Sequence, residues 1–456
     1  MSSHADIRAE LNNKAPMYTY GVEALQNGVS ALAPGTLHFV YRDTTIKTDL
    51  VCGVEWDYSS SSMYLTRTGD ASSFVNPAPA SSLLQEGKSP FDYIMPWAGM
   101  KRYNIINSTV MYSEDDDEFD ATNYDTVVYI PQFYYKAEKD TSNSKWRWSI
   151  SAVARDGFAL HPGSGRYVGR YHTCEVDGAH KSVSGVDFIG ELTPDAYRVN
   201  AITKGNGWYQ IDYATICAIF ILYIVEYANW NSQSYLGVGS DSQRLPNGVT
   251  DGAKYHTLRI SNSSNQYRWI ENLWSNARQW VDGFIAVNQS VYLCTDPNLY
   301  SNTTTNYTSS GVTLPSSGSI TGFGYSTNFP WAFIPDKNGG ADNTYVCDTV
   351  NSASGTMLLY TGGNSDNNTS YGLFYHGAHH DASYANWDVG SRLMFVPGST
   401  GGGASVAVPT SANGTIEEGT NTISLTDASA GSYTLKYEDA DGNPLNTFAN
   451  IGRIEV

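Results

Sequence analysis

Short runs of alternating apolar and polar residues occur along most of the chain, a pattern typical of many short strands joined by turns. Residues 127–137 (VVYIPQFYYKA) and 146–153 (WRWSISAV) are two such runs, and the polar residues between them predict a turn that pairs them as strands. Similar runs predict further strands at residues 36–41, 54–58, 63–66, 158–171, 291–294, 322–334 and 345–350. We therefore expect an α+β protein with many short strands and few helices.

One run departs from this alternation and predicts a helix over residues 209–229. Its residues are apolar nearly all round, which indicates a helix that is buried on more than one face. Asp212 falls in its first turn, where the helix dipole favours an acidic side chain. The aromatic segment at residues 268–284 is predicted to supply core side chains, and Glu271 and Asp282 within it are interpreted as structural residues, not as a catalytic acid/base pair.

Two long polar segments follow in the second half of the chain. Residues 300–319 are rich in Ser, Thr and Asn, and predict a long loop that is functional or mobile. Residues 362–386 alternate small residues with Asn, Asp, Ser, Tyr and His, and predict an exposed loop that residues 387–396 anchor as an apolar strand. Antibody paratopes use the same residue types, but an ordinary polar surface loop fits this composition equally well.

The pattern also divides the chain into parts. Residues 398–404 (GSTGGGA) predict a flexible linker and the clearest domain boundary. Residues 405–456 contain short alternating strands and a hairpin turn at Asp441-Gly442, which predict a small all-β, immunoglobulin-like sandwich. Residues 49–397 form the main domain, and residues 1–48 are interpreted as an attachment or covering segment.

Composition narrows the classes of partner. The 456-residue chain holds 33 Tyr, 11 Trp and 42 Gly with only 16% charged residues, which suits a folded, loop-rich protein. Its net charge of −18 argues against a nucleic-acid backbone or an anionic membrane as the partner. The start of the chain lacks the basic and apolar regions of a signal peptide, and the apolar run at residues 211–225 is too short to span a bilayer.

The cysteines and the acidic residues give no metal site. The five cysteines are odd in number, widely spaced and without a CxxC pair, so we expect reduced, mostly buried thiols. The acidic run at residues 114–120 (EDDDEFD) lacks the ligand spacing of an EF-hand calcium loop and is interpreted as a solvated loop. We therefore expect no metal and no cofactor.

Several ordered motifs carry a resemblance to a known family. They are GVEWDYSSSSMYLTRTGDA, PQFYYKAE, LYIVEYANWNSQSYLGVG, WIENLWSNARQWVDGF and NWDVGSRLMFV, which together span residues 53–396. The series resembles the C-type-lectin-like structural proteins of phages and prophages, including variable proteins that retroelements diversify. Formylglycine-generating enzymes share this fold. The resemblance implies a C-type-lectin-like domain at residues 49–397.

The same resemblance implies a variable region closed by a strand of GxRL type. Gly390, Arg392 and Leu393 match that closing motif, and Arg392 would be a buried, hydrogen-bonded framework residue. In diversified relatives, adenine-targeted mutagenesis changes Asn codons to codons for residues such as Tyr, His, Asp and Ser. The displayed, ligand-binding residues would be Asn364, Ser365, Asp366, Asn367, Asn368, Ser370, Tyr371, Tyr375, His376, His379, His380, Asp381, Ser383, Tyr384 and Asn386. A fixed loop of similar composition remains the alternative.

The resemblance implies a non-enzymatic adhesin on the virion surface, assembled in the host cytoplasm, such as a tail-fibre tip or a capsid head fibre. It would bind a bacterial cell-surface receptor, protein or glycan, and its other partners would be virion proteins and further copies of the chain. The Glu-Pro-Asn and Trp-Asn-Asp motifs of calcium-dependent sugar-binding lectins are missing from this chain.

Two alternatives stay open. One is a structural capsid decoration or baseplate protein without a receptor. The other is an enzyme of the formylglycine-generating type, whose chemistry uses a pair of cysteines to bind copper. Cys294 and Cys347 are the only plausible late pair, and the residues around them do not match that family.

Overall fold

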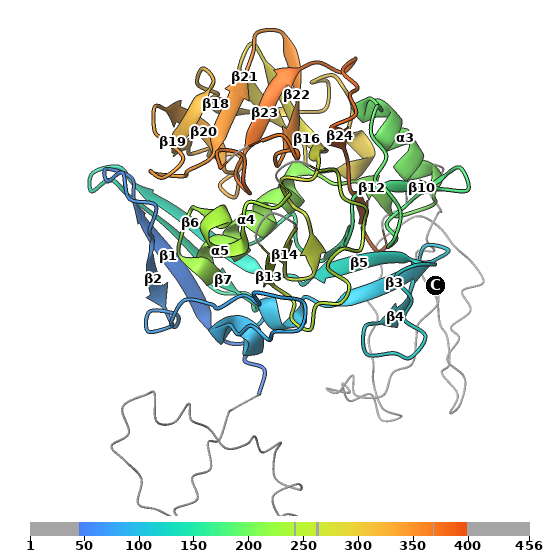
Figure 1. Cartoon of the computed structure of the whole chain (residues 1–456). Coiled ribbons are helices and arrows are strands. Elements are labelled where there is room, and N and C mark those ends of the chain that lie inside the picture. Colours follow the sequence, from blue (N-terminus) through green and yellow to red (C-terminus); the bar gives the residue numbers. More distant parts are fainter. Residues whose placement is uncertain (1–44, 241–242, 261–263, 368, 399–456) are drawn as a thin grey trace, which may run out of the picture.

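The computed structural model describes residues 45–240, 243–260, 264–367 and 369–398. Strands predominate over helices, and α4 lies in the middle of them (Figure 1), which confirms the predicted α+β composition. The predictions for residues 36–41, for residues 399–404 of the linker and for the immunoglobulin-like module at residues 405–456 lie outside the described residues. So does nearly all of the proposed attachment segment at residues 1–48.

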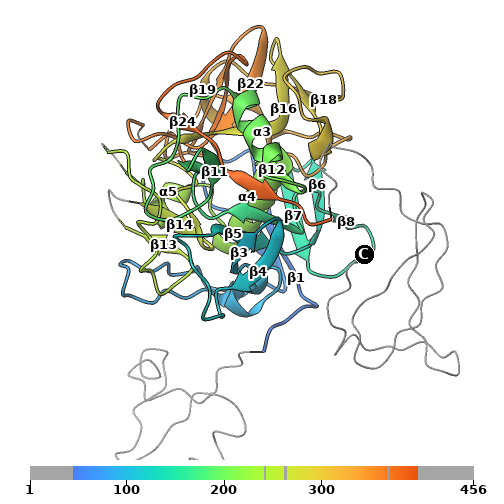
Figure 2. The same cartoon turned by 90° about the vertical axis from the view of Figure 1, so that its right-hand side faces the viewer.

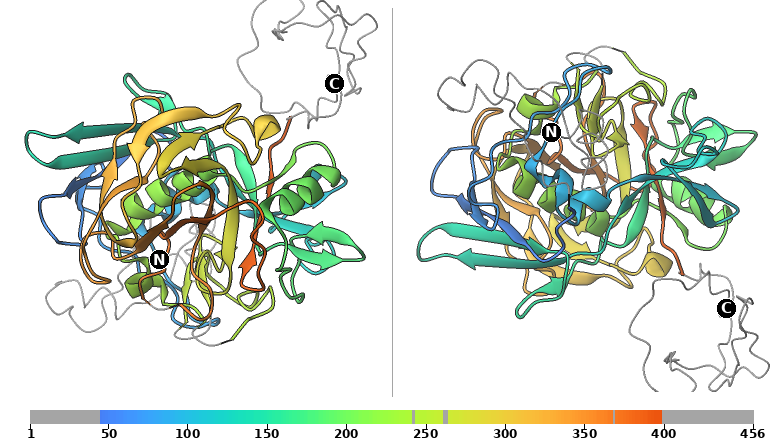
Figure 3. Two further views of the ribbon diagram at one scale, coloured as in Figure 1. Left: turned by 90° about the horizontal axis from the view of Figure 1, so that it is seen from above. Right: turned by 90° about the horizontal axis from the view of Figure 1, so that it is seen from below.

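The central helix α4 (Tyr213–Tyr227) is buried along its whole length, as its uniformly apolar sequence predicts. Asp212 caps it by accepting a hydrogen bond from the Thr215 N–H group at 2.7 Å, and Ala228 ends it in a left-handed conformation. The helix contacts β1, β7 and β16, and views from above and below show it enclosed on several sides (Figure 3). It begins four residues later than predicted, because residues 208–210 form strand β12 instead.

The sheet on one side of α4 contains the hairpin predicted from residues 127–137 and 146–153. Its strands are, in spatial order, β2 (Thr66–Gly69), β1 (Val51–Asp57), β7 (Lys145–Ser151), β6 (Tyr134–Asp140) and β8 (Ala159–Leu160). The predicted pairing of residues 127–137 with 146–153 is half right. Residues 134–137 do pair with β7, but Pro131 follows directly on β5, which belongs to another sheet.

The second sheet includes the last described strand of the chain. Its order is β12 (Trp208–Gln210), β25 (Leu393–Phe395), β9 (Arg166–Gly169), β5 (Asp125–Ile130), β3 (Arg102–Ile106) and β4 (Thr109–Ser113). The last described strand, β25, therefore lies between two strands that precede it by more than a hundred residues. Helix α3 (Pro194–Thr203) packs beside β12 (Figure 2).

The largest sheet contacts α4 through β16 and includes three of the residues predicted to bind, His376, His379 and His380. Its order is β18 (Thr308–Thr313), β17 (Ser290–Leu293), β16 (Arg278–Val287), β22 (Thr356–Thr361), β23 (His376–His380), β21 (Thr349–Ser352), β19 (Gly318–Gly324) and β20 (Ile334–Asn338), and β24 (Val389–Gly390) also pairs with β16.

The prediction that residues 300–319 form one long loop is wrong, because β18 and the start of β19 lie within them. Ser310 points inward in β18 and donates to the Val291 carbonyl at 2.8 Å, so a half-buried strand can be built from Ser and Thr.

Small elements complete the described fold. They are β10 (Cys174–Val176), β11 (Ala179–Lys181), β13 (Leu258–Arg259), β14 (Asn265–Tyr267), β15 (Ile270–Glu271), α5 (Ser232–Leu236) and the 3-10 helices η1 (Pro90–Tyr93), η2 (Trp97–Gly99) and η3 (Pro297–Leu299). The cysteines are all buried and free, as predicted.

Candidate functional site

The predicted binding segment at residues 362–386 is not one exposed loop. Asn364, Ser365, Tyr375 and His376 are buried, so the prediction that these four side chains are displayed is wrong. Residues 376–380 form β23, an interior strand of the largest sheet, which includes the buried His376 and begins directly after Tyr375. Of the remaining predicted residues, Asp366, Asp381 and Ser383 are exposed, and Asn367, Ser370, Tyr371, His379, His380, Tyr384 and Asn386 are half-buried. Asn368 lies outside the described residues.

Before β23, the chain is held by a group that we name the Asp348 clamp. It comprises the side chains of Asp348 and Ser232 and the N–H groups of residues 372–374. Asp348 Oδ1 accepts from Gly372 at 2.6 Å and Oδ2 accepts from Phe374 at 2.8 Å. Ser232 Oγ accepts from the N–H group of Leu373 at 3.1 Å. The clamp fixes the segment that leads from Tyr371 into β23.

A ladder of aromatic rings links the core to the surface at β23. Tyr360, on β22, is buried, and its ring centre lies 5.5 Å from that of His379 and 5.8 Å from that of His380. The His380 and Tyr384 rings stack at 3.6 Å with an interplanar angle of 4°. In the other direction, Tyr360 contacts the buried Tyr375 ring at 6.1 Å, which in turn contacts Tyr371 at 4.7 Å.

We name the half-buried rings at the two ends of this ladder the His/Tyr surface; its members are Tyr371, His379, His380 and Tyr384. Each ring is in contact with another ring, so these side chains are positioned before any partner arrives. Sequence reasoning missed Tyr360, which joins the two ends, because it lies in a different strand and looks like any apolar core residue. No signal in the sequence marks it.

Both histidines of this surface favour the neutral form. Burial, followed by the neighbouring His380 and Arg278, lowers the pKa of His379 to about 4. Burial and Arg278 also lower the pKa of His380. Neutral imidazole rings both donate and accept hydrogen bonds, so near pH 7 the surface offers polar contacts without positive charge on its histidines.

An ion pair holds the base of the segment. Arg278 Nη1 pairs with Asp388 Oδ2 at 2.5 Å, and Asn364 Nδ2 donates to the same oxygen at 2.8 Å. Asn367 Oδ1 accepts from the Asn364 N–H group at 2.9 Å, which closes the turn after β22. Asn364 therefore has a structural role, and this explains why it is buried.

The turn after β23 is held by its own polar side chains. Asp381 Oδ1 accepts from the N–H and hydroxyl groups of Ser383 at 2.9 and 2.6 Å, and Asn386 Nδ2 donates to the Tyr384 hydroxyl at 3.0 Å. Trp387 follows this turn and is 39% exposed, so the prediction that it anchors a strand is wrong. The apolar strand begins later, at β24 and β25.

Arg392 is buried and hydrogen-bonded, as the resemblance implies. Its guanidinium donates to Gln279 Oε1 at 2.9 Å and to four backbone carbonyls, those of Gly169, Arg170, Glu271 and Asn272, at 2.8, 2.8, 2.7 and 3.2 Å. These carbonyls come from two distant segments, so one side chain ties both of them to the end of the domain.

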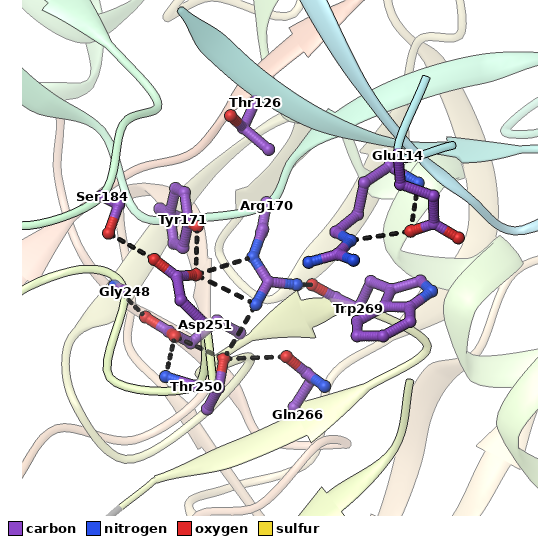
Figure 4. A network of polar contacts seen from close by, with 12 residues as sticks. Glu114, Thr126, Arg170, Tyr171, Ser184, Gly248, Thr250, Asp251, Gln266 and Trp269 are labelled. Atoms are coloured by element: carbon purple, nitrogen blue, oxygen red, sulfur yellow. Dashed lines mark hydrogen bonds and ion pairs between the residues drawn. The ribbon is translucent and has the colours of Figure 1, made fainter. Parts of the chain in front are cut away.

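A second polar network, drawn in Figure 4, supports the segment around Glu271. Arg170 donates to the Trp269 carbonyl at 2.8 Å and pairs with Asp251 at 3.2 Å. Glu271 Oε2 accepts from the N–H and hydroxyl groups of Thr250 at 2.8 and 2.5 Å. The Arg102 guanidinium lies 3.9 Å from the Trp269 ring centre.

Glu271 and Asp282 have different partners, as their structural interpretation expects. Glu271 accepts hydrogen bonds from Thr250, whereas Asp282 pairs with Arg198 at 2.6 Å.

No group of three or more His, Cys, Asp or Glu side chains that could hold a metal ion occurs in the part of the chain that the structure describes. Burial raises the pKa of Cys347 to about 12 and also raises that of Cys294. Such shifts favour the protonated form of both thiols. The acidic run carries local contacts, including Glu114 with Arg102 at 2.7 Å and Asp115 with Lys101 at 2.5 Å.

Comparison with protein-family models finds no match, and comparison with curated proteins finds none either. Within the described ranges, no helix is long and apolar enough to cross a membrane.

Proposed function

We propose that this chain is an adhesin on the surface of a phage particle and that the His/Tyr surface contacts a bacterial cell-surface molecule. The main observation that supports this proposal is the continuous ladder of rings from buried Tyr360 and Tyr375 to half-buried Tyr371 and Tyr384. Rigid aromatic rings offer contact area at little cost in conformational entropy.

The polar side chains around the rings support the same proposal. Asp381 and Ser383 are exposed beside the stack of His380 and Tyr384, and Asn386 reaches the Tyr384 hydroxyl. Hydrogen-bonding groups around a central aromatic cluster are the usual composition of a recognition surface. The sequence resemblance to C-type-lectin-like phage proteins supports the location on a phage particle and the C-type-lectin-like fold as parts of this proposal, and the strand pattern of residues 405–456 supports the immunoglobulin-like module. Copies arrayed on a virion would add avidity to weak individual contacts.

The proposal is tested by replacing three members of the surface together. A Tyr371→Ala/His380→Ala/Tyr384→Ala variant should bind host cells at least about tenfold more weakly than the native chain, because several contacts of a binding hot spot are lost. Thermal unfolding should remain cooperative, since each replaced ring is half-buried. A Tyr64→Ala/Tyr325→Ala variant is the matched control, because these tyrosines are 62% and 41% exposed outside the His/Tyr surface.

The outcomes separate the candidate functions. Normal attachment by the triple variant would remove the His/Tyr surface from receptor binding. Particles that carry the protein but show no chain-dependent attachment to any host would favour a capsid decoration or baseplate role.

If the segment is diversified, substitutions should be found in its coding region. Sequencing the coding region across a phage population should find adenine substitutions at codons for displayed positions such as Asp366, His379 and Tyr384. Codons for Asn364, Tyr375 and His376 should tolerate few changes, because these side chains are buried. An invariant region without a template copy nearby would identify a fixed adhesin.

A further inference from the structure

Trp387 differs from the other tryptophans of the chain in its exposure. Nine of the eleven tryptophans are buried and Trp269 is half-buried, whereas Trp387 is 39% exposed. Among the described residues, the Trp387 indole takes part in no ring contact and no side-chain hydrogen bond. A single exposed apolar side chain is common on protein surfaces, so its surroundings must show whether it serves recognition.

The backbone that carries this indole is fixed. Asn386 Oδ1 accepts from the Trp387 N–H group at 2.8 Å. The Asn386 carbonyl accepts from the N–H groups of Glu191 and Val389 at 2.9 and 3.2 Å. A Cβ atom added at Gly190 would lie 2.6 Å from the Trp387 carbonyl oxygen, so the two backbones are in direct contact. The indole is therefore displayed on a backbone that is positioned before any ligand arrives.

The Asn386 side chain joins Trp387 to the His/Tyr surface. Its Nδ2 donates to the Tyr384 hydroxyl at 3.0 Å, while its Oδ1 holds the Trp387 N–H group. Tyr384 in turn stacks on His380. We name residues 381–387 the Trp387 turn; it extends the His/Tyr surface by one exposed aromatic side chain.

The turn also offers hydrogen-bonding groups of both kinds. Asp381 Oδ1 accepts from Ser383, and no hydrogen-bond partner of Asp381 Oδ2 occurs among the described residues. The Tyr384 hydroxyl accepts from Asn386, so its own proton can still be donated. Donors and acceptors beside an apolar ring match a sugar, which presents hydroxyl groups at its edge and C–H groups on its face.

The charges at the turn favour a neutral ligand. Arg278 is already in an ion pair, and Arg244 already donates to the carbonyls of Phe188 and Trp387. The Asp381 side chain, by contrast, is exposed. A phosphate or carboxylate on the ligand would therefore meet a negative charge at the turn, and both neighbouring arginines are engaged elsewhere.

The apolar area of the turn is small. Trp387 is the one large apolar side chain that is exposed within described residues 326–367 and 369–398. A specific protein partner typically covers about 800 Å² on each side, with an apolar centre. One indole surrounded by polar groups is closer to the size of a single sugar ring.

We propose that the Trp387 turn is a subsite for a neutral saccharide. The C–H face of a sugar ring packs on the Trp387 indole, and its hydroxyl groups bond to Asp381, Ser383 and the Tyr384 hydroxyl. The assignment rests on the proposed function in one respect, namely that the saccharide belongs to the bacterial surface.

Attachment of the full chain to host cells tests the role of the indole. Trp387→Ala should lower attachment at least about tenfold, because a tryptophan at the centre of a contact is a typical hot spot. Trp387→Tyr should retain most of the attachment, because an aromatic face remains. Tyr325→Ala is the matched control, since Tyr325 is 41% exposed outside the turn, and it should attach as the native chain does. Native attachment by Trp387→Ala would overturn the subsite.

Pretreatment of the cells identifies the chemistry of the partner. Periodate cleaves the vicinal diols of sugars and should abolish attachment, whereas proteinase K should not. Added salt should leave attachment nearly unchanged, because screening weakens contacts between charges only. Loss after both treatments would place the sugar on a glycoprotein and support the subsite. Attachment that survives periodate but not proteinase K would identify a protein receptor and overturn it.

Saturation-transfer NMR tests the turn without cells. The probes are the methyl glycosides of glucose, galactose, mannose and N-acetylglucosamine. Irradiating the aromatic protons of the native chain should transfer saturation to the C–H protons of at least one probe. The transfer should persist in Tyr325→Ala and disappear in Trp387→Ala. Absence of transfer to every probe, or equal transfer in Trp387→Ala, would overturn the subsite.

The subsite and the proposed function can fail separately. If the Tyr371, His380 and Tyr384 variant loses attachment while Trp387→Ala attaches normally, the adhesin stands and the subsite is wrong. If transfer to a glycoside depends on Trp387 and no cell binds the chain, the subsite stands and the adhesin is wrong.

Discussion

Arg392 donates a hydrogen bond to the backbone carbonyl of Glu271 at 2.7 Å, although the two residues are 121 positions apart in the chain. The bond joins the closing strand to a segment in which Arg268, Trp269, Asn272 and Ser275 all have positive φ angles. Such backbone conformations cost free energy at residues other than glycine, and the surrounding contacts must maintain them. Arg392 is one of those contacts.

Replacing Arg392 should therefore lower the stability of the domain by more than the loss of a single contact would. Arg392→Ala removes the guanidinium donor from four buried carbonyls, of which that of Arg170 keeps the Glu271 N–H group, and we expect a loss of at least about 3 kcal/mol in the free energy of unfolding. Urea denaturation measures this change. Arg147→Ala is the control, because the Arg147 side chain is 42% exposed and pairs with Glu55 near the surface. Equal effects of the two substitutions would contradict the role given to Arg392.

The buried pair of Arg198 and Asp282 should behave differently when one partner or both are removed. Arg198→Met leaves a buried, unpaired carboxylate at Asp282 and should cost about 3–5 kcal/mol of stability. An Arg198→Met/Asp282→Leu variant should recover most of this loss, because no charge then remains buried. Urea denaturation of the single and double variants gives the comparison. A double variant as unstable as the single one would show that the pair does more than neutralise charge.

Acid should destabilise the fold through its buried histidines. His376 is buried, and burial lowers its pKa to about 4. Its contribution to stability is complete above about pH 6.5, the pKa of an unfolded histidine, and is lost as the pH falls toward 4. We expect the stability difference between the native chain and His376→Gln to shrink over this range in thermal unfolding experiments. A constant difference from pH 7 to pH 4 would contradict this account.

The thiols should be unreactive in the native state. All five cysteines are free and buried, and burial raises the pKa of Cys52 to about 12. An aromatic disulfide reagent should therefore label the folded chain slowly and label five thiols after denaturation. A reducing agent should leave the melting temperature unchanged, because no disulfide contributes to the described fold.

Truncating two tryptophans in the second half of the chain should lower the free energy of unfolding by very different amounts. Trp280→Ala removes a fully buried ring and should cost about 3–5 kcal/mol. Trp387→Ala removes a side chain that is 39% exposed and should cost about 1 kcal/mol or less. Chemical denaturation distinguishes them, and a large loss for Trp387→Ala would restore an anchoring role for that residue.

The sequence predicts best where local pattern and tertiary environment agree. The apolar run of α4 can only be accommodated by burial on all sides, and this environment is what the structure contains. The alternation of residues 146–153 likewise has one good interpretation, the strand β7. Arg392 was identified by the resemblance to a family motif, since an arginine in an apolar strand has no single structural meaning by itself.

Prediction fails where small polar residues are buried by distant partners. Asn364 and Ser365 look like residues of a surface turn, but both are buried, and Asn364 donates a hydrogen bond to Asp388, 24 positions away. The same residue types form the half-buried strand β18, where a loop was predicted. In both segments, the number of polar residues resembles that of a loop, and the hydrogen-bond partners that allow burial come from elsewhere in the chain.

The position of β25 has a consequence for how the domain forms. This strand separates β9 from β12, so the sheet that they share stays open until residues 393–395 are available. During synthesis, the edges of β9 and β12 that pair with β25 therefore remain unpaired. Unpaired strand edges can form hydrogen bonds with strands of other chains. Contacts between residues so far apart in sequence also slow folding. A ribosome-bound chain that ends before residue 393 should therefore bind chaperones strongly and resist protease poorly compared with one that extends past residue 398.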